Sequence, residues 1–277
     1  MRGNHVRRRL EAGEASVGCW LSLPSPESAE YVSRLGFDWL VVDTEHNPID
    51  IRTLAHMLSV IGASPATAAM VRIPWNTPEH FKRVLDAGAW GVVVPMVNRR
   101  EEAEAAVRAT RYHPMGERSV GGGRHALSFD ATPGDYYSRA NEEVLLVVQI
   151  EHIHGVEHAD EILSVPGVDA CFIGPNDLAA SMGLGLGIPY EWEHPQLAEA
   201  VAHVRETCVR HGVAPGIHTS GAAAVNQRLA EGFRFVAMAS ELRYMLGGIS
   251  TDLSRLEWTP AGRETIETRD QEVPARR

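Results

Sequence analysis

Eight short apolar segments recur along the chain, and between them lie longer segments with helical periodicity. The apolar segments are continuous rather than alternating, which is typical of strands that are buried on both faces of a parallel sheet. A regular alternation of strand and helix predicts an α/β fold in which helices cover the sheet. The expected strands are residues 17–22, 37–42, 67–72, 91–96, 144–150, 169–174, 213–218 and 234–239.

The helical segments carry the signals of helix ends. Pro26, Pro78 and Pro195 stand at expected first turns, where the missing N–H of a proline costs nothing. Glycines at the far ends of several segments indicate C-terminal caps. Eight strand–helix units predict a single (β/α)₈ barrel over residues 1–258, preceded by a short N-terminal helix. A doubly wound open sheet is the alternative fold. Examples of the expected helices are residues 26–35, 78–87, 100–111 and 195–211.

Two segments depart from the alternation. Residues 113–141 are glycine-rich and are expected to form a long loop, which in a compact domain is usually functional or disordered. The run of three glycines in it lacks the spacing of a nucleotide-binding loop, so we expect no nucleotide cofactor. If this loop closes over the site, Arg118, Arg124 and His125 become substrate contacts. Residues 259–277 are polar and aperiodic, and we expect them to form a mobile tail.

Composition narrows the range of partners and compartments. The formal net charge of −10 argues against nucleic acid and anionic membrane surfaces as partners. The three scattered cysteines suggest neither disulfides nor a zinc site, and they fit a cytoplasmic protein. No apolar run has the length of a membrane span, and no apolar segment follows the N-terminal arginines as it would in a secretory signal.

Polar residues gather where the expected strands end, and in a barrel these ends form the active-site face. The second strand, for example, runs into the sequence DTEH, and the third ends in an arginine. Carboxylate, guanidinium and imidazole groups are therefore expected to converge on one rim. The candidate site residues are Trp20, Asp43, His46, Arg72, Gln149, Glu151, Gly174, Asn176, Asp177 and His218.

Glu151 and Asp177 are the candidate metal ligands. Two carboxylates at adjacent strand ends would repel each other in a partly buried pocket, and a divalent cation removes that repulsion. Oxygen ligands of this kind suit Mg²⁺, Mn²⁺ or Co²⁺. The alternative is that each carboxylate caps a following helix, which for Asp177 alone is equally plausible. The pair favours a metal.

His46 and Arg72 are the candidate catalytic side chains. Asp43 lies three residues before His46, and a carboxylate that orients an imidazole raises its basicity, so we expect a general base. Arg72 is expected to point into the mouth of the barrel, where it either stabilises an anionic substrate oxygen or forms a structural ion pair. The backbone N–H groups of Asn176 and Asp177 open a helix and are expected to bind a carboxylate.

The chain has a single lysine, Lys82, so any mechanism through a lysine Schiff base would have to use it. Lys82 stands between Phe81 and Val84 in a segment whose apolar residues define one helix face. The lysine itself belongs to the opposite, solvent-facing stripe outside the barrel. We therefore expect no Schiff-base lysine.

Several segments resemble a known family, the class II pyruvate aldolases of the HpcH/HpaI aldolase family. The resemblance covers roughly residues 4–256 and implies a metal-dependent carbon–carbon lyase on a (β/α)₈ barrel. Such an enzyme reversibly cleaves a 4-hydroxy-2-keto acid to pyruvate and an aldehyde through a metal-stabilised enolate. The best known members act on 4-hydroxy-2-oxoheptanedioate and on 2-keto-3-deoxy sugar acids. The matching runs are GCWLSLPSPESAEYVSRLGFDWLVVDTEH, VRIPWNTPEHFKRVLDAGAWGVVVPMV, RYHPMGERSVGGG, QIEH, VPGVDACFIGPNDLAASMG and APGIHT.

The resemblance also implies roles for single residues. Glu151 and Asp177 match the metal carboxylates of the family. His46 matches its base, with Asp43 as the partner of the imidazole, and Arg72 matches the arginine that stabilises the enolate.

The resemblance further implies a homohexamer, a trimer of dimers, with active sites near subunit interfaces. Asp86 matches a family aspartate, but it stands at a helix C-terminus, from which it would reach an active site only across an interface. Two stretches depart from the family pattern: His218 and Thr219 replace apolar residues, and the loop has the sequence RSVGGGRHAL. Both are expected to contact the aldehyde half of the substrate, so the pyruvate half is the better defined.

Two alternatives stay open at the level of sequence. An oxaloacetate decarboxylase or a citrate-lyase-like enzyme would form the same enolate on the same fold. A non-catalytic ligand-binding barrel is the alternative from a different class, and the intact set of carboxylates, arginine and histidine argues against it.

Overall fold

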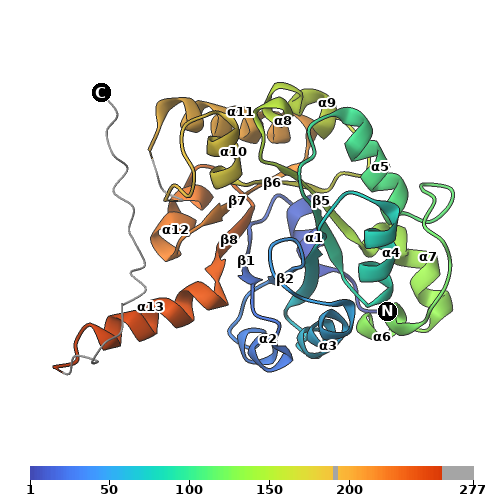
Figure 1. The fold of residues 1–277 in the computed structure, drawn as a ribbon. Coiled ribbons are helices and arrows are strands. Elements are labelled where there is room, and N and C mark those ends of the chain that lie inside the picture. Colours follow the sequence, from blue (N-terminus) through green and yellow to red (C-terminus); the bar gives the residue numbers. More distant parts are fainter. Residues whose placement is uncertain (190–192, 258–277) are drawn as a thin grey trace.

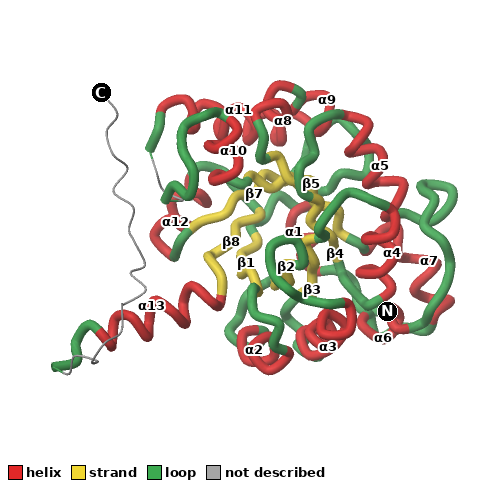
Figure 2. The backbone as a smooth tube through the Cα atoms, viewed as in Figure 1, coloured by secondary structure: helices red, strands yellow, loops and turns green. Residues whose placement is uncertain are grey.

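A computed structural model describes residues 1–189 and 193–257, so the expected tail at 259–277 lies outside the described residues. Parallel strands close into a barrel in chain order, with β8 pairing with β1. Figure 2 shows these strands at the centre with the helices around them. The strands are β1 (Ser16–Leu21), β2 (Trp39–Asp43), β3 (Ala68–Arg72), β4 (Gly91–Val94), β5 (Leu145–Ile150), β6 (Ala170–Ile173), β7 (Ala214–Thr219) and β8 (Phe235–Ser240).

Helices follow the strands, as the alternating pattern predicts, and the closed sheet excludes the doubly wound alternative. Pro26, Pro78 and Pro195 occupy first turns, as predicted. No helix of the described residues is long and apolar enough to cross a membrane. The helices are α1 (His5–Glu11), α2 (Pro26–Val32), α3 (Ile51–Gly62), α4 (Pro78–Asp86), α5 (Arg100–Thr110), α6 (Arg124–Ser128), α7 (Pro133–Glu143), α8 (Ile153–Glu157), α9 (Ala159–Leu163), α10 (Pro175–Ser181), α11 (Pro195–His211), α12 (Ala222–Ala230) and α13 (Glu241–Leu253).

Aromatic side chains fill the interior of the barrel. Trp39 of β2 stacks on Phe235 of β8 with ring centroids 4.1 Å apart, and a Cβ on Gly18 would lie only 2.0 Å from the Trp39 ring. Trp20 of β1 contacts Phe172 of β6 at 5.6 Å between centroids. Because β1 and β6 are not neighbours, this contact crosses the interior. The filled interior leaves the carboxyl ends of the strands, here called the mouth, as the place for a ligand.

The expected loop over residues 113–141 is irregular up to Gly123 but contains two helices after it, which corrects the sequence interpretation in part. It contains α6 and α7, and α7 begins with a capping box in which Thr132 and Asp135 bond to each other's backbone N–H groups. Between the two helices, Phe129 stacks on Trp90 with centroids 4.6 Å apart. Trp90 leads into β4, so this segment packs at the amino ends of the strands, here called the foot.

The helix α13 extends away from the barrel (Figure 1). Its first turn contacts β1 and β8, and Glu241 is its only residue that is buried. The Glu241 carboxylate accepts hydrogen bonds from the backbone N–H groups of Ser22, Leu23 and Leu242 at 2.7–3.0 Å. These bonds fix the start of α13 at the mouth of the barrel, while the rest of the helix projects outward.

Candidate active site

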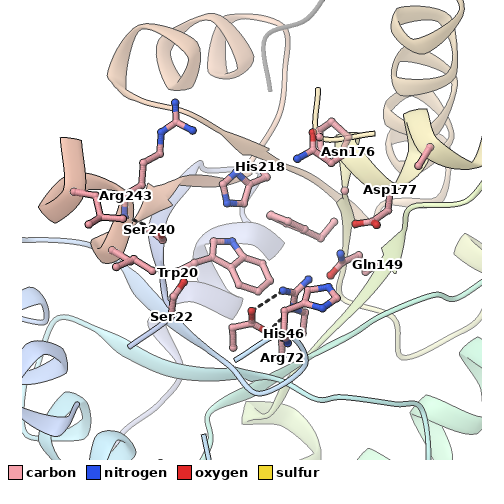
Figure 3. A pocket seen from close by; sticks show the side chains of 18 of the residues that line it. Trp20, Ser22, His46, Arg72, Gln149, Asn176, Asp177, His218, Ser240 and Arg243 are labelled. Carbon is pink, nitrogen blue, oxygen red and sulfur yellow. Dashed lines mark hydrogen bonds and ion pairs between the residues drawn. The ribbon is translucent and has the colours of Figure 1, made fainter. Parts of the chain in front are cut away.

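A cavity of about 840 Å³ opens at the mouth of the barrel (Figure 3). Its size is in the range of small-molecule sites, and its walls come from the carboxyl ends of strands on all sides of the barrel. The candidate site residues therefore converge at the mouth, as predicted from the sequence. Of the ten, Glu151 does not line the cavity and is buried behind its wall. The predicted residues that line the cavity are Trp20, Asp43, His46, Arg72, Gln149, Gly174, Asn176, Asp177 and His218.

Arg72 is held by two carboxylates at the end of β3. Its Nε and Nη2 donate to the two oxygens of Asp43, both at 2.8 Å, and its Nη1 lies 3.1 Å from Glu45 Oε2. The guanidinium also lies over the Trp20 ring, 4.4 Å from its centroid. Burial disfavours the charged form, but hydrogen bonds and charge from Asp43 outweigh it and raise the pKa of Arg72. The arginine is therefore a fixed, permanent cation at the cavity wall.

The structure corrects the expected partner of His46. Asp43 does not orient the imidazole, because both of its carboxylate oxygens bond to Arg72. The strand register explains this, since Asp43 and Arg72 are direct neighbours on β2 and β3. Asp43 also accepts a 2.6 Å hydrogen bond from the Asn47 side chain. The carboxylate near the ring is that of Glu45, 3.7 Å from His46 Nε2, and the imidazole is largely exposed to the cavity.

Glu151 is a buried carboxylate at the end of β5. Its Oε1 accepts a 2.9 Å hydrogen bond from the backbone N–H of Met96, which has a positive φ of 54°, and its Oε2 accepts from the Gln149 side chain. Burial, together with the negative charges of Asp177 and Glu45, raises the pKa of Glu151 to about 7. The folded protein thus holds an excess of negative charge at this wall.

Asp177 stands on the rim next to Glu151, in the first turn of α10. The helix is preceded by Gly174 as its N-cap, and no side chain caps it, so the capping alternative for Asp177 is not what the structure shows. Gly174 leaves room beside Glu151, because a Cβ at this position would lie 2.8 Å from Glu151 Oε2 and 3.1 Å from Gln149 Nε2. Two buried oxygens here, Gln149 Oε1 and Asn176 Oδ1, lack a hydrogen-bond partner.

The described residues contain no group of three histidine, cysteine or carboxylate side chains close enough to hold a metal ion on their own. What the wall offers is the Glu151 and Asp177 pair, with Glu45 and the amide oxygens nearby. These are hard oxygen donors of the kind that Mg²⁺ and Mn²⁺ prefer. Surplus negative charge, unpartnered oxygens and the space at Gly174 all fit a small divalent cation.

Trp20 and His218 form the opposite part of the wall, with ring centroids 6.0 Å apart. Burial, together with the positive charges of Arg72 and Arg243, lowers the pKa of His218 to about 3. His218 is therefore a neutral imidazole at physiological pH.

Three residues that were expected to contact the substrate, Arg118, Arg124 and His125, lie away from the cavity. At the foot, Arg118 contacts Asp86 at 2.8 Å and the Tyr136 hydroxyl at 2.9 Å, and His125 is buried beside them. Arg124 contacts α3 through Ala55 O and Ser59 Oγ. The expectation that this segment closes over the site is therefore wrong within one chain. The position of Asp86, far from its own rim, is as predicted.

The sequence analysis did not single out several residues that support or line the site. Glu45 lies within the DTEH run that drew attention to His46, so its signal was available. Met96 contributes only a backbone N–H, for which side-chain patterns give no sign. Ser240 ends β8, Arg243 lies in the first turn of α13, and both line the cavity.

The chain matches the family model of the HpcH/HpaI aldolase/citrate lyase over residues 16–246. It is 41% identical over 240 residues to the 5-keto-4-deoxy-D-glucarate aldolase of Enterobacter sp. (strain 638), covering 86% of this chain and 91% of that protein. Solved structures of this family are also similar. One from Burkholderia cenocepacia J2315 superposes with a TM-score of 0.83 at 36% identity, over 91% of this chain and 98% of the other. One from Desulfitobacterium hafniense DCB-2 has a TM-score of 0.82 at 30% identity, over 93% and 98%.

The similarity thus spans the whole barrel, including every strand end that lines the cavity. The family resemblance implied a carbon–carbon lyase, and the aldolase relatives at 40–41% identity confirm this activity. The chain therefore belongs to the HpcH/HpaI aldolase/citrate lyase family, as an aldolase.

Proposed function

We propose that the enzyme cleaves a 4-hydroxy-2-keto acid to pyruvate and an aldehyde, with a divalent cation held by Glu151 and Asp177. The observation that supports this most directly is the surplus of carboxylate at the cavity wall, which raises the pKa of Glu151 to about 7 through burial and neighbouring charge. A cation bound there would act as a Lewis acid that stabilises the pyruvate enolate. Mg²⁺, Mn²⁺ and Co²⁺ are the candidates.

The side chains around the cation site divide the remaining tasks. Arg72 is held by Asp43 and Glu45 and presents a fixed positive charge, which stabilises the oxygen that becomes negative in the enolate. His46 is exposed to the cavity and accepts the proton of the 4-hydroxyl group during cleavage. The backbone N–H groups at Asn176 and Asp177 bind the carboxylate of the keto acid.

Removal of the cation tests this proposal. Dialysis against EDTA is expected to abolish pyruvate release, and addition of Mg²⁺, Mn²⁺ or Co²⁺ in parallel is expected to restore it. Pyruvate is measured with a coupled dehydrogenase, and a panel of aldehydes in the condensation direction identifies the second substrate. Full activity after rigorous chelation would contradict the assignment of Glu151 and Asp177 as metal ligands.

We also infer that the enzyme is a homo-oligomer, as the family resemblance implies, with a hexamer built as a trimer of dimers. The support in this chain is α13, which projects from the barrel and exposes a set of apolar side chains. These apolar side chains are Tyr244, Met245, Leu246, Ile249 and Leu253. Light scattering behind a sizing column measures the mass of the assembly.

The three cysteines are free and buried, which supports a reducing cytoplasm as the location.

A further inference from the structure

A small cavity lies outside the barrel, between α4, α5 and the irregular residues 113–123. Its volume is about 230 Å³, and it shares no lining residue with the cavity at the mouth. Figure 1 shows α4 and α5 on the outside of the barrel, and the two helices are in contact. This cavity is here called the side cavity. It is lined by Pro78, Lys82, Ala105, Arg108, Ala109, Glu117, Arg118 and Ser119.

The lining of the side cavity is basic. Lys82 of α4, Arg108 of α5 and Arg118 of the irregular segment bring positive charge from three directions, and Glu117 is the carboxylate of the lining. The whole chain has 36 acidic and 26 basic residues, so this ratio reverses that of the chain. Positive charges gathered in one place repel each other, and an anion between them removes the repulsion.

Two of these cations are at the rim without a partner of their own. Lys82 and Arg108 are exposed, and neither side chain forms a hydrogen bond or an ion pair with any residue of 1–189 or 193–257. Glu79, one turn before Lys82, is near enough to interact with its charge but does not line the cavity. Both positive charges are therefore available to an anion in the side cavity.

Arg118 forms the buried part of the lining. Its side chain is 1% exposed, and its two terminal nitrogens contact the Tyr136 hydroxyl at 2.9 Å and Asp86 at 2.8 Å. Its Nε is buried and has no hydrogen-bond partner among the described residues. A buried donor without an acceptor costs free energy, and an anion bound beside the guanidinium would offset that cost.

The irregular segment is the wall with the fewest bonds. It is tied to α5 as far as Arg118, whose backbone N–H donates to the carbonyl of Arg111 at 2.9 Å. Beyond this point, the hydrogen bond that residues 119–123 make within the described chain is a 3.3 Å bond from the Tyr137 hydroxyl to the carbonyl of Gly121. An anion that also contacts Ser119 would fasten this segment to both helices.

The size of the side cavity selects a small ligand. Its 230 Å³ is below the range of about 300–1,000 Å³ that is typical of drug-sized ligands, so a nucleotide is too large and a phosphate group fits. Arginine and lysine are the side chains that bind phosphate oxygens through charged hydrogen bonds. Donors on three separate elements suit a tetrahedral anion, whose oxygens point in several directions.

We propose that the side cavity binds a phosphate group, either as the free ion or as part of a small phosphorylated molecule. Lys82 and Arg108 contact the group from the rim, and Arg118 contacts it from the buried side. The bound group fastens residues 113–123 to α4 and α5. The site lies outside the barrel, so it depends neither on the proposed cation nor on aldol cleavage.

Titration of the metal-free protein with inorganic phosphate tests the proposal, with binding followed by phosphorus NMR at constant ionic strength. Phosphate is expected to bind with a Kd on the order of 1 mM, as suits a few charged hydrogen bonds at a partly exposed site. Lys82→Gln and Arg108→Gln should each raise this Kd on the order of 10-fold. Both variants replace exposed side chains, so the fold is retained.

Amide hydrogen exchange measures the second part of the proposal. Exchange over residues 113–123 should slow when phosphate is added, and the slowing should be lost in Lys82→Gln and Arg108→Gln at the same phosphate concentration. Arg34→Gln is the matched control, because it removes an exposed arginine that pairs with Glu30 and does not line the side cavity. It should change neither the Kd nor the exchange.

The results separate a built site from general charge attraction. Absence of phosphate binding, or a Kd that is the same in Lys82→Gln, Arg108→Gln and the unaltered protein, would overturn the site. An equal rise of Kd in Arg34→Gln would overturn it as well, and unchanged exchange over residues 113–123 would overturn the fastening role. Glycerol 3-phosphate, titrated in parallel, identifies the source: tighter binding than inorganic phosphate assigns the site to a phosphorylated molecule, and equal or weaker binding assigns it to the free ion.

Discussion

The foot and the mouth of the barrel differ in how their charges are paired. At the foot, Asp169 lies between two arginines, 3.0 Å from Arg7 and 2.9 Å from Arg111. Arg111 is fully buried and also donates a 3.1 Å hydrogen bond to the carbonyl of Gly167. The Asp169 carboxylate is therefore paired with an arginine on each side, and the network joins α1, the end of α5 and the start of β6.

The mouth lacks this balance. Arg72 is shared between Asp43 and Glu45, while Glu151 and Asp177 have no cation of their own among these contacts. The pKa of Glu151 is raised because the carboxylate is buried and because the charges of Asp177 and Glu45 repel it. At the foot, loss of a pairing partner would leave a buried charge alone, whereas the surplus of carboxylate at the mouth costs stability and is what the proposed cation would neutralise.

The sharpest test of this contrast exchanges arginine for lysine at both ends. Arg72→Lys keeps the charge but loses the planar fork that Asp43 and Glu45 hold, so we expect kcat for pyruvate release to fall on the order of 1000-fold. Arg111→Lys at the foot should leave kcat nearly unchanged and lower the free energy of unfolding by about 3 kcal/mol. Kinetics and urea unfolding measure both. Near-normal turnover of Arg72→Lys would mean that the arginine is structural.

A second test removes the surplus charge. The ordinary pKa of Glu151 is 4.5 and the folded value is about 7, so between these pH values only the unfolded chain gives up the proton. The metal-free protein should lose about 3 kcal/mol of stability as pH rises through this window. Glu151→Gln removes this loss, so the variant should be inactive yet more stable than the parent at pH 8, and the difference should vanish toward pH 4.5.

The matched change at the foot should act in the opposite direction. Asp169→Asn leaves Arg111 buried beside Arg7 without their shared carboxylate, and we expect it to cost about 3–5 kcal/mol. Urea unfolding without metal at pH 8 compares the two variants. A loss of stability in Glu151→Gln comparable to that in Asp169→Asn would remove the distinction between the two ends.

The third prediction concerns His46, which lies at the mouth but outside the buried carboxylate group. His46→Ala should lower aldol cleavage on the order of 100-fold, because the proton of the 4-hydroxyl group loses its acceptor. Oxaloacetate decarboxylation has no such hydroxyl group and should be affected less. Pyruvate formation from the two substrates is measured side by side, and equal losses in both would indicate a structural role for His46.

The barrel was predictable from sequence because its strands are buried on both faces, so the apolar runs stand out against the helices between them. The loop prediction over 113–141 holds up to Gly123 and is wrong beyond it, where α6 and α7 lie. Thr132, Pro133 and Asp135 are a capping signal that was present in the sequence.

The sequence predicted which strand ends carry the site residues, but it did not predict which of these side chains bond to one another. The spacing along the chain predicted that Asp43 orients His46. The register of β2 and β3 instead places Asp43 beside Arg72, to which its carboxylate bonds. The position of Arg243 at the cavity had no signal at all, because it depends on how Glu241 fixes the start of α13. Contacts between elements distant in sequence decide both cases.

The smallest effect is expected at Lys82, which belongs to neither end. Carbanion chemistry next to a carbonyl needs an electron sink, either a lysine Schiff base or a metal ion. Lys82 lies on the exposed face of α4, while its neighbours Phe81 and Val84 are buried, so the amine is outside the barrel and away from the cavity. Lys82→Arg should therefore retain near-normal turnover, and borohydride added with pyruvate should leave the enzyme active. Mass spectrometry checks the second expectation. A pyruvate adduct trapped on Lys82 would mean that the electron sink is a Schiff base and not the proposed cation.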